Sequence, residues 1–329
     1  MTRPDIVFLD SHTLNPGDLS WGELEALGRF TEYARTAPHE VVERAREADI
    51  LIVNKTRLTE SHFAALPRLR LVCVAAAGYD VVDTKAARRR GIPVCNTAGY
   101  ANRAVAQMAV ALLLEATNRV GAYAEANRHG FWSQSPDFCC WDAPLTELDG
   151  KRLAIVGFGG IGSTLAAMMR PFGMRLSAVS SKSAAELPPD VEKTTIEEAF
   201  ATADVVSLHC PLTAANEGFV NERLLDGCRR GLILVNTARG RLVDDEAVAR
   251  ALADGRLGAY ATDVLSEEPP RAEHPLLHAP RCYVTPHVAW ATVEARSRII
   301  DLLRNNIRAF LNGRPINVVN GTAGTAAAH

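Results

Sequence analysis

The hexapeptide Gly157-Phe158-Gly159-Gly160-Ile161-Gly162 stands directly between the apolar run RLAIVG (152–157) and the segment STLAAMMR (163–170). It is a G-x-G-x-x-G sequence between a predicted strand and a predicted helix. We expect Gly157 to permit a tight turn, Gly159 to admit a pyrophosphate and Gly162 to let the helix pack against the strand. The free N–H groups at the start of that helix then face the phosphates. The pattern predicts a dinucleotide-binding βαβ unit.

On both sides of this loop, short β-rich runs alternate with segments at helical spacing. The expected strands are IVFLD (6–10), ILIVN (50–54), LRLVCVAA (69–76), IPVCN (92–96), RLSAVS (175–180), VVSLH (205–209), LILVN (232–236), YATDV (260–264) and CYVTPH (282–287). The expected helices include 39–48, 84–91, 101–120, 161–171, 196–203, 221–228, 244–254 and 291–311. The alternation predicts an α/β protein with parallel sheets covered by helices on both faces.

Composition limits the class of protein. A chain of 329 residues suggests two domains, and a net charge of -2 gives no reason to expect nucleic acid or a membrane as a partner. The N-terminal segment lacks the apolar region of a signal peptide, and no apolar stretch is suited to span a bilayer. Of the seven cysteines, the vicinal pair Cys139–Cys140 lacks zinc-ligand spacing and is interpreted as packing, and we expect no metal site. We expect reduced thiols in a cytoplasmic protein. The low-complexity tail GTAGTAAAH (321–329) is expected to be disordered.

The end of the second strand of the nucleotide unit departs from the usual pattern. An acidic residue there normally holds the ribose 2′-OH, but this strand ends in Ser180, Ser181 and Lys182. Serines and a lysine suit a 2′-phosphate better than a 2′-OH. The alternative is a solvated turn, with the adenosine held elsewhere.

Three further segments follow the ends of predicted strands in the same half of the chain. They contain Arg239 in NTARG (236–240), Glu268 in DVLSEEP (263–269) and His287 in TPH (285–287). Because ligands bind at the carboxyl edge of open α/β sheets, we expect these side chains to form a catalytic set. The alternative for each residue alone is a structural salt bridge or a surface loop.

These residue types fit the reduction of a ketone by hydride. An imidazole titrates near neutral pH, so His287 can supply the proton for the new alkoxide. A carboxylate at Glu268 would favour the imidazolium. The guanidinium of Arg239 offers two parallel donors to a substrate carboxylate and can polarise the keto oxygen.

At this point the sequence resembles the D-isomer-specific 2-hydroxyacid dehydrogenase family over about residues 5 to 318. The motifs that carry the resemblance are GFGGIG, HCPLT (209–213), NTARG, DVLSEEP and TPHVAWAT (285–292). It implies that Arg239 binds substrate, that Glu268 is the partner of His287 and that His287 is the acid/base. It also implies a substrate-carboxylate loop at Ala76-Ala77-Gly78. Besides the glycine-rich loop and the 180–182 turn, the implied nucleotide contacts are Cys210, Pro211, Thr237, Ala238, Arg239, Asp263 and His287.

The resemblance further implies two Rossmann- or flavodoxin-like domains with the active site in the cleft between them. Residues 1–100 and 289–329 would form the substrate-binding domain, and residues 101–288 the NAD(P)-binding domain. A homodimer is expected, with the helix 101–120 and the irregular stretch 128–150 as its contacts. The cofactor is expected to be NADP or NAD, with NADP favoured by the 180–182 turn.

Within the family, Asn54–Lys55, SPDF (135–138) and Trp290 resemble the glycerate dehydrogenase or hydroxypyruvate reductase branch. The expected substrates are therefore hydroxypyruvate and glyoxylate. The alternatives are another 2-keto acid, such as phenylpyruvate or 3-phosphohydroxypyruvate, and a non-enzymatic, nucleotide-sensing corepressor.

Overall fold

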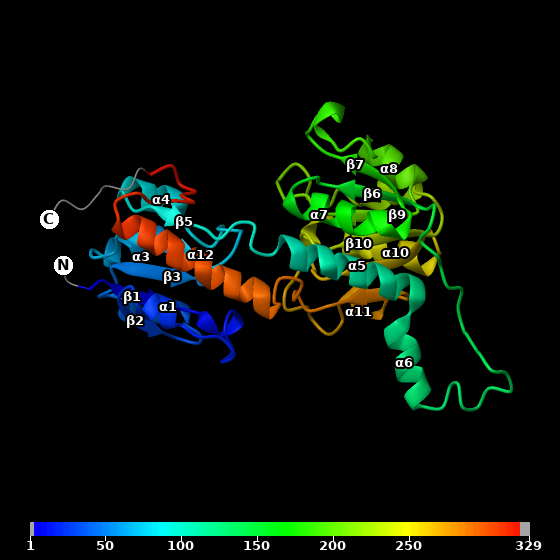
Figure 1. Cartoon of the computed structure of the whole chain (residues 1–329), viewed down its shortest axis with the longest axis horizontal. Coiled ribbons are helices and arrows are strands. Elements are labelled where there is room, and N and C mark those ends of the chain that lie inside the picture. Colours follow the sequence, from blue (N-terminus) through cyan, green and yellow to red (C-terminus); the bar gives the residue numbers. More distant parts are fainter. Residues whose placement is uncertain (1–2, 323–329) are drawn as a thin grey trace. The chain divides into compact units, whose positions relative to one another are not determined.

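A computed structural model describes residues 3–322, so most of the low-complexity tail lies outside the described residues. The chain divides into two compact units (Figure 1). One unit contains the chain up to Tyr100 and from Ala291 onward, and the other contains Ala101–Trp290. Among residues 3–322, no helix is long and apolar enough to cross a membrane.

The first unit is built on a five-stranded parallel sheet in the order β2-β1-β3-β4-β5. This 2-1-3-4-5 order is that of flavodoxin-like folds. The strands are β1 (Asp5–Phe8), β2 (Arg29–Glu32), β3 (Ile50–Val53), β4 (Leu71–Val74) and β5 (Val94–Cys95). The helices are α1 (Gly22–Glu25), α2 (Val41–Ala45), α3 (Glu60–Ala65), α4 (Thr84–Arg89) and α12 (Val293–Leu311).

The second unit is built on a seven-stranded parallel sheet in the order β12-β11-β10-β9-β6-β7-β8. The order reverses between β6 and β9, as in Rossmann folds. The strands are β6 (Arg152–Val156), β7 (Arg175–Val179), β8 (Val191–Lys193), β9 (Val205–Leu208), β10 (Leu232–Asn236), β11 (Leu257–Thr262) and β12 (Cys282–Val284). The helices are α5 (Asn102–Asn118), α6 (Val120–Arg128), α7 (Gly160–Met169), α8 (Ile196–Thr202), α9 (Glu222–Asp226), α10 (Asp245–Ala253) and α11 (Pro275–His278). The predicted fold class, two doubly wound parallel-sheet domains, is confirmed.

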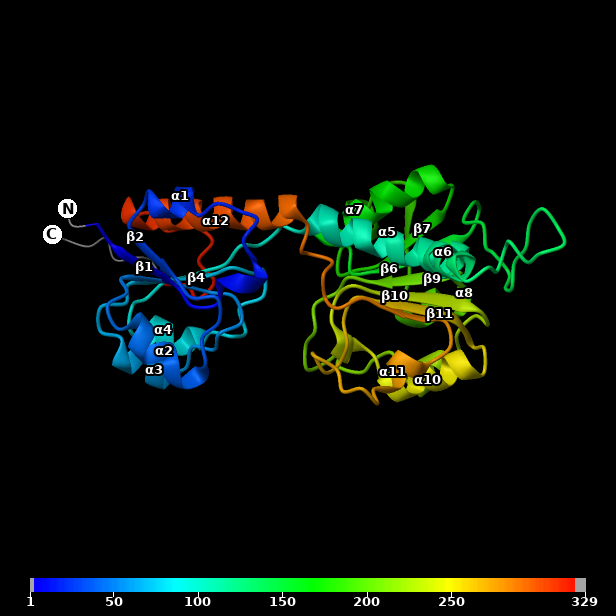
Figure 2. The same ribbon diagram turned by 90° about the horizontal axis from the view of Figure 1, so that it is seen from below.

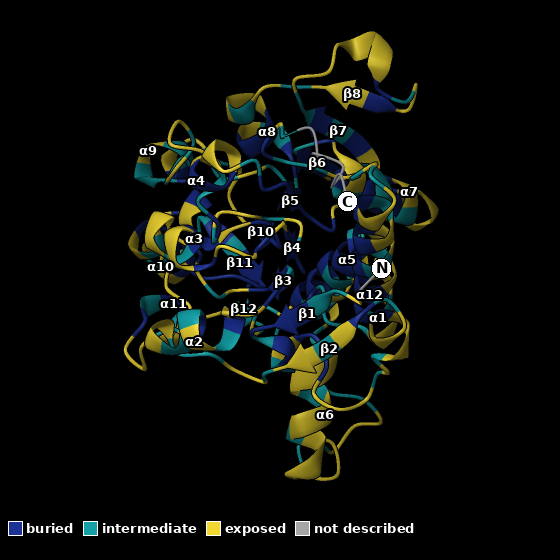
Figure 3. Cartoon of the chain, turned by 90° about the vertical axis from the view of Figure 1, so that its left-hand side faces the viewer, coloured by how far each residue is buried: buried dark blue, intermediate teal, exposed yellow. Residues whose placement is uncertain are grey.

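Helices cover both faces of each sheet (Figure 2). In the first unit, α2, α3 and α4 lie on one face, and α1 and α12 lie on the other. In the second unit, α5 and α7 lie on one face, and α8, α9, α10 and α11 lie on the other. Strands buried on both faces read as continuous apolar runs, which is why the sequence shows them so clearly. Figure 3 shows the inner strands buried, whereas β2 and β8 at the sheet edges are largely exposed.

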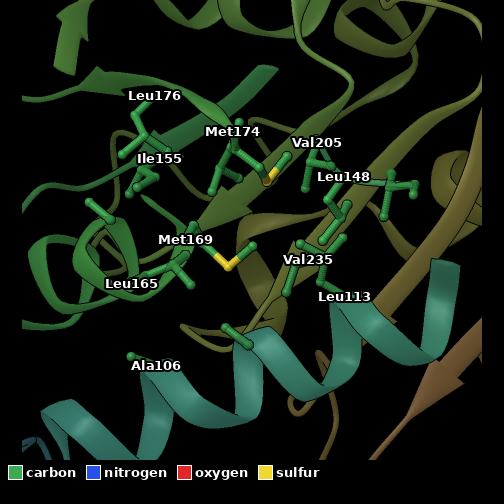
Figure 4. Close-up of a cluster of buried hydrophobic side chains, with 14 of the residues drawn as sticks. Ala106, Leu113, Leu148, Ile155, Leu165, Met169, Met174, Leu176, Val205 and Val235 are labelled. Atoms are coloured by element: carbon green, nitrogen blue, oxygen red, sulfur yellow. The ribbon is translucent and has the colours of Figure 1, made fainter. Parts of the chain in front are cut away.

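Alternating residues of β6 supply the two cores of the second unit. Leu153 and Ile155 pack toward α5 and α7, whereas Ala154 and Val156 pack toward α8 and α10. Successive strand residues point to opposite faces of the sheet, so one strand serves both cores. Figure 4 shows the first core, in which Leu113 of α5 and Leu165 of α7 gather against the sheet.

The structure differs from the sequence-based expectations in its edge strands and in several helices, of which the short α1, α3 and α11 were not predicted. The edge strands β2 and β8 were not predicted, because their exposed polar residues carry no strand pattern. The predicted helix 101–120 ends at Asn118, where Arg119 adopts a left-handed conformation with φ of 54°. A second helix, α6, which was not predicted, begins immediately afterwards and ends at Arg128, where the predicted irregular stretch begins.

Candidate active site

The glycine-rich loop leaves no room for side chains at its first and last positions. Gly157 has a φ of 97°, and a Cβ there would lie 2.5 Å from the backbone nitrogen of Cys210. A Cβ on Gly162 would lie 2.1 Å from the carbonyl oxygen of Gly157. Gly159, in contrast, has no heavy atom within 4 Å of an added Cβ, so the space above it is open. The residues therefore fit a bound pyrophosphate, with α7 starting at Gly160.

A cavity of about 980 Å³ opens beside this loop, in the size range of cofactor sites. The predicted nucleotide-binding residues that line it are Gly157, Phe158, Gly159, Ser180, Ser181, Lys182, Cys210 and Pro211. Gly160, Ile161 and Gly162 do not line the cavity; they form the first turn of α7. Sequence reasoning missed Ile196, Phe219 and Leu224, which supply an apolar wall from separate segments.

The 180–182 turn presents a cation to the cavity. The ammonium of Lys182 lies 5.8 Å from the centre of the Phe158 ring, within the range of a cation–π contact. The hydroxyl of Ser180 accepts a hydrogen bond from the backbone N–H of Lys182 at 3.2 Å. No carboxylate stands at these three positions, as the sequence indicated.

Arg239 does not line the cavity. The 236–240 turn, which follows β10, positions it. The buried side chain of Asn236 accepts a hydrogen bond from the N–H of Ala238 at 3.0 Å and donates to the carbonyl of Arg239 at 3.0 Å. A Cβ on Gly240 would lie 1.9 Å from the carbonyl carbon of Leu265. The turn that carries Arg239 therefore packs directly on the loop that carries Glu268.

Asp263 follows β11 and organises the segment that carries His287. Its buried carboxylate accepts hydrogen bonds from the Thr285 hydroxyl at 2.6 Å and from the N–H groups of Val288 and Ala289 at 2.9 Å and 2.8 Å. These donors satisfy a buried charge that would otherwise be costly. His287 itself has a φ of 55°, a conformation that only a well-packed segment maintains.

Glu268 and His287 form a direct pair. The Nδ1 atom of His287 lies 2.6 Å from Oε2 of Glu268, and Oε1 of Glu268 accepts the N–H of Leu265 at 3.0 Å. Because Nδ1 faces the carboxylate, Nε2 is the nitrogen left to exchange a proton with a bound molecule. Both side chains are about one-third exposed, so this pair remains accessible.

A polar cluster that the sequence did not reveal supports the Glu268 loop. Asp245, at the start of α10, accepts a hydrogen bond from the hydroxyl of Ser266 and lies 3.1 Å from Nε2 of His274. Burial raises the pKa of Asp245. The only sequence signal was the position of Asp245 in the first turn of a predicted helix, which also suits a solvent-exposed residue.

His209 is a second group that the sequence did not single out. Its Nε2 lies 2.8 Å from the Ser207 hydroxyl, and its Nδ1 lies 3.4 Å from the hydroxyl of Thr237. The residue lines the cavity, but protein surrounds its ring, and this desolvation lowers the pKa of His209 to about 4. A neutral imidazole therefore links the ends of β9 and β10.

The predicted carboxylate loop lies in the other unit, after β4. The carbonyl of Ala76 accepts the N–H of Thr97 at 3.1 Å, and the carbonyl of Ala77 accepts the side-chain amide of Asn96 at 2.7 Å. Within residues 3–322, the N–H groups of Ala76, Ala77 and Gly78 have no acceptor. Three consecutive donors of this kind suit a carboxylate.

The fold and this arrangement define a nicotinamide-nucleotide-dependent oxidoreductase of two doubly wound domains. Residues 110–289 match the NAD-binding domain of the D-isomer specific 2-hydroxyacid dehydrogenases. The chain belongs to this D-2-hydroxyacid dehydrogenase family, and its cofactor is NAD(P).

Relatives match along nearly the whole chain. A hydroxypyruvate reductase of Blautia hydrogenotrophica is 41% identical, covering 96% of this chain and 99% of that protein. A glycerate dehydrogenase of Methylorubrum extorquens is 37% identical, covering 95% of this chain and 98% of that protein. The structure of an NADPH-dependent glyoxylate/hydroxypyruvate reductase from Sinorhizobium meliloti, with NADP and malonate, covers 100% of both chains at a TM-score of 0.84 and 26% identity. These similarities confirm the predicted family and its branch.

The desolvated His209 predicts a specific dependence of stability on pH. The unfolded chain takes up a proton near the ordinary imidazole pKa of about 6.5, whereas the folded chain keeps His209 neutral down to about pH 4. This contribution to stability is complete above about pH 6.5 and is lost as the pH falls toward 4. The melting temperature should therefore fall less steeply over this range in His209→Asn than in the wild type. Equal slopes for the two proteins would show that His209 titrates normally in the fold.

Proposed function

We propose that this protein reduces a small 2-keto acid, hydroxypyruvate or glyoxylate, to the D-2-hydroxy acid. The observation that carries the proposal is the pair of His287 and Glu268, whose Nδ1 and Oε2 atoms lie 2.6 Å apart at the carboxyl edge of the nucleotide-binding sheet. The names of the two relatives above, a hydroxypyruvate reductase and a glycerate dehydrogenase, support this choice of substrate.

Each proposed role follows from the position of its residue. A bound nicotinamide would supply the hydride. His287 donates the proton to the forming alkoxide through Nε2, and Glu268 stabilises the imidazolium through Nδ1. Arg239 holds the substrate carboxylate and polarises the keto oxygen. The N–H groups of Ala76–Gly78 provide further donors to that carboxylate.

The proposed nucleotide contacts fall into two groups. The glycine-rich loop, the 180–182 turn, Cys210 and Pro211 hold the adenosine and the phosphates, a proposal that their shared position at one cavity supports. Thr237, Ala238, Arg239, Asp263 and His287, at the ends of β10, β11 and β12, adjoin the nicotinamide. We propose a preference for NADPH, because Lys182 supplies a cation and the turn lacks a carboxylate that would repel a 2′-phosphate.

We also propose a cytoplasmic homodimer. All seven cysteines are free of disulfides in the structure, which suits a reducing compartment. Helix α6 and the segment after it project from the rest of their unit in Figure 1, and this segment exposes 90% of Phe138 and 67% of Trp141. Large exposed aromatic side chains in one segment are typical of an interface.

The substrate prediction is tested with a panel of 2-keto acids and NAD(P)H oxidation measured at 340 nm. We expect hydroxypyruvate and glyoxylate to be reduced with higher kcat/KM than phenylpyruvate or 3-phosphohydroxypyruvate. The product from hydroxypyruvate should be D-glycerate. Chiral analysis that finds L-glycerate would contradict the proposed arrangement of the site.

The roles of His287 and Glu268 are tested by pH–rate profiles in the reductive direction. His287 must be protonated to donate its proton to the alkoxide, so the reductive rate should fall as the pH rises. Glu268→Gln removes the charge that stabilises the imidazolium, and the fall should begin at lower pH; Glu267→Gln, with the same charge change, should leave the profile unchanged. His287→Asn should lower kcat about a hundredfold or more while nucleotide binding persists. Near-normal turnover in His287→Asn would assign the proton to another group.

The nucleotide preference is tested by comparing kcat/KM for NADPH and NADH. Lys182→Ala should reduce the value for NADPH more than that for NADH, and Ser180→Asp should shift the preference toward NADH by repelling a 2′-phosphate. Lys151→Ala, at the opposite end of β6, is the control for loss of a positive charge. A wild-type protein that strongly prefers NADH and does not respond to Lys182→Ala would overturn this prediction.

The dimer is tested by sedimentation of the wild type and of a Phe138→Ser/Trp141→Ser variant. The variant should sediment as a monomer at concentrations where the wild type is a dimer, because the exposed aromatic side chains are lost. Phe172→Ser, which removes an exposed aromatic side chain elsewhere in the unit, should remain dimeric. A wild-type monomer would refute the proposal.

A further inference from the structure

Ser266, two residues before Glu268, is tied by its side chain to the start of a helix. Its hydroxyl donates a hydrogen bond to Oδ2 of Asp245, in the first turn of α10. The same oxygen lies 3.1 Å from Nε2 of His274. Nδ1 of His274 accepts the N–H of Leu276 at 3.4 Å, so the proton of the neutral ring is on Nε2 and faces Asp245. Asp245 therefore joins two donors from separate segments at one oxygen.

The carboxylate of Asp245 depends on these two donors. Its side chain is 12% exposed, and within residues 3–322 its other oxygen, Oδ1, is buried and has no hydrogen-bond partner. Burial raises the pKa of Asp245, and the hydrogen bonds from Ser266 and His274 act in the opposite direction. The other titratable groups near this carboxylate in the described part of the chain are Asp244, Tyr260 on β11 and Cys282 on β12. Loss of either donor would leave the charge with a single hydrogen bond, which is costly.

The anchor at Asp245 belongs to the packed part of the second unit. Its helix, α10, buries an apolar face and packs on α11, which His274 directly precedes. His274 is itself buried. Core packing therefore holds Asp245 and His274 in place, whereas Ser266 is exposed on a loop. The hydrogen bond between them ties an exposed loop to a rigid core.

The backbone of Ser266 is also constrained. A Cβ on Gly240 would lie 2.4 Å from the backbone nitrogen of Ser266, so the 236–240 turn packs directly against this residue. The turn restrains the backbone of Ser266, and Asp245 restrains its side chain. The loop between β11 and α11 therefore has a fixed point at Ser266.

This fixed point helps to determine where the carboxylate of Glu268 lies. Oε1 of Glu268 accepts the N–H of Leu265 at 3.0 Å, so the side chain folds back over the loop that Ser266 anchors. Oε2 of Glu268 lies 2.6 Å from Nδ1 of His287. A shift of the loop would lengthen this contact between the carboxylate and the imidazole, and the attraction between opposite charges weakens with distance.

We propose that Ser266 and Asp245 are positioning residues that hold Glu268 against His287, with His274 keeping Asp245 in place. Both act through the conformation of residues 265–268 and not through contact with the substrate. The proposal rests on the proposed role of Glu268 as the partner of His287. Its consequence is that the pH range over which His287 donates a proton depends on the hydrogen bond between Ser266 and Asp245. A purely structural tie would change the stability of the protein and leave that pH range unchanged.

Ser266→Ala tests the proposal, because Ser266 is exposed and its replacement should not prevent folding. The reductive pH–rate profile of the full chain is measured with NADPH and hydroxypyruvate. We expect kcat to fall about threefold to tenfold, the effect of one hydrogen bond, and the alkaline fall to begin at lower pH than in the wild type. The KM for hydroxypyruvate and the affinity for NADPH should stay near wild type, because Arg239 and the glycine-rich loop are intact. A wild-type profile in Ser266→Ala would overturn the proposal, whatever the change in melting temperature.

Matched variants separate positioning from the loss of a hydroxyl or a charge. Ser266→Thr keeps the hydroxyl at an exposed position and should restore the wild-type profile, and Ser297→Ala, which removes a hydroxyl that donates to Val293 within α12, should not change it. Asp245→Asn should shift the alkaline fall in the same direction as Ser266→Ala. Glu246→Gln, which removes an exposed acid at the next position, should not shift it. An equal shift in Glu246→Gln, or no recovery in Ser266→Thr, would contradict the proposal.

Combination with Glu268→Gln shows whether Ser266 acts through Glu268. Ser266→Ala should shift the alkaline fall in the wild-type background and not in the Glu268→Gln background, because the side chain that it positions there carries no charge. Additive shifts would mean that Ser266 affects His287 by another route, and the proposal would be wrong. An unchanged profile in Glu268→Gln alone would refute the proposed role of Glu268 and the positioning with it. A shift in Glu268→Gln without one in Ser266→Ala would refute the positioning alone.

Proton NMR of His287 in the protein without ligands gives a readout that does not depend on turnover. A carboxylate held close to the ring stabilises the imidazolium, so the titration midpoint of His287 should be lower in Ser266→Ala than in the wild type. Ser266→Thr should titrate like the wild type. Equal midpoints in the wild type and in Ser266→Ala would show that Glu268 reaches His287 without the help of Ser266, which would reject the proposal.

Discussion

The nucleotide-binding unit depends on the close approach of two backbones at the end of β6. An added Cβ at Gly157 would lie 2.5 Å from the nitrogen of Cys210, so the backbones that follow β6 and β9 approach too closely for a side chain at Gly157. Gly162, in the first turn of α7, has no room for a side chain either, because an added Cβ would meet the carbonyl oxygen of Gly157. These two contacts place the start of α7 over the point where the strand order reverses, which is where open α/β sheets bind ligands. The cavity, its apolar wall and the turn with Lys182 are arranged around that point.

A comparable constraint positions the residues to which we assign the chemistry. Arg239, Glu268 and His287 follow three neighbouring strands, but their strands alone do not bring the side chains together. Gly240 packs on the backbone of Leu265, and the carboxylate of Asp263 holds the backbone after β12. Buried side chains therefore fix the backbone from which each exposed group projects. A site built in this way has little freedom to rearrange before the reaction, which is what preorganisation requires.

The sequence predicted the features that depend on local pattern and not those that depend on distant contacts. Inner strands such as Ile50–Val53 read as apolar runs because both of their faces are buried, whereas the exposed β2 gave no such signal. The conformation of Arg119, which ends α5, has no glycine or proline to mark it. The cluster of Asp245, Ser266 and His274 joins residues that are 21 and 29 positions apart, and each alone resembles an ordinary surface residue.

The two sheets share one way of fixing a loop at the carboxyl edge. Asp263 in one unit and Asp10 in the other stand just after a strand, and each accepts backbone N–H groups from a neighbouring loop. A carboxylate that accepts backbone N–H groups fixes a loop without using a basic side chain. Within the described residues, the guanidinium of Arg239 donates to the carbonyl of Ala238 at 2.7 Å and forms no ion pair. In both units a carboxylate just after a strand therefore fixes the backbone of a neighbouring loop, and in the second unit that loop carries His287.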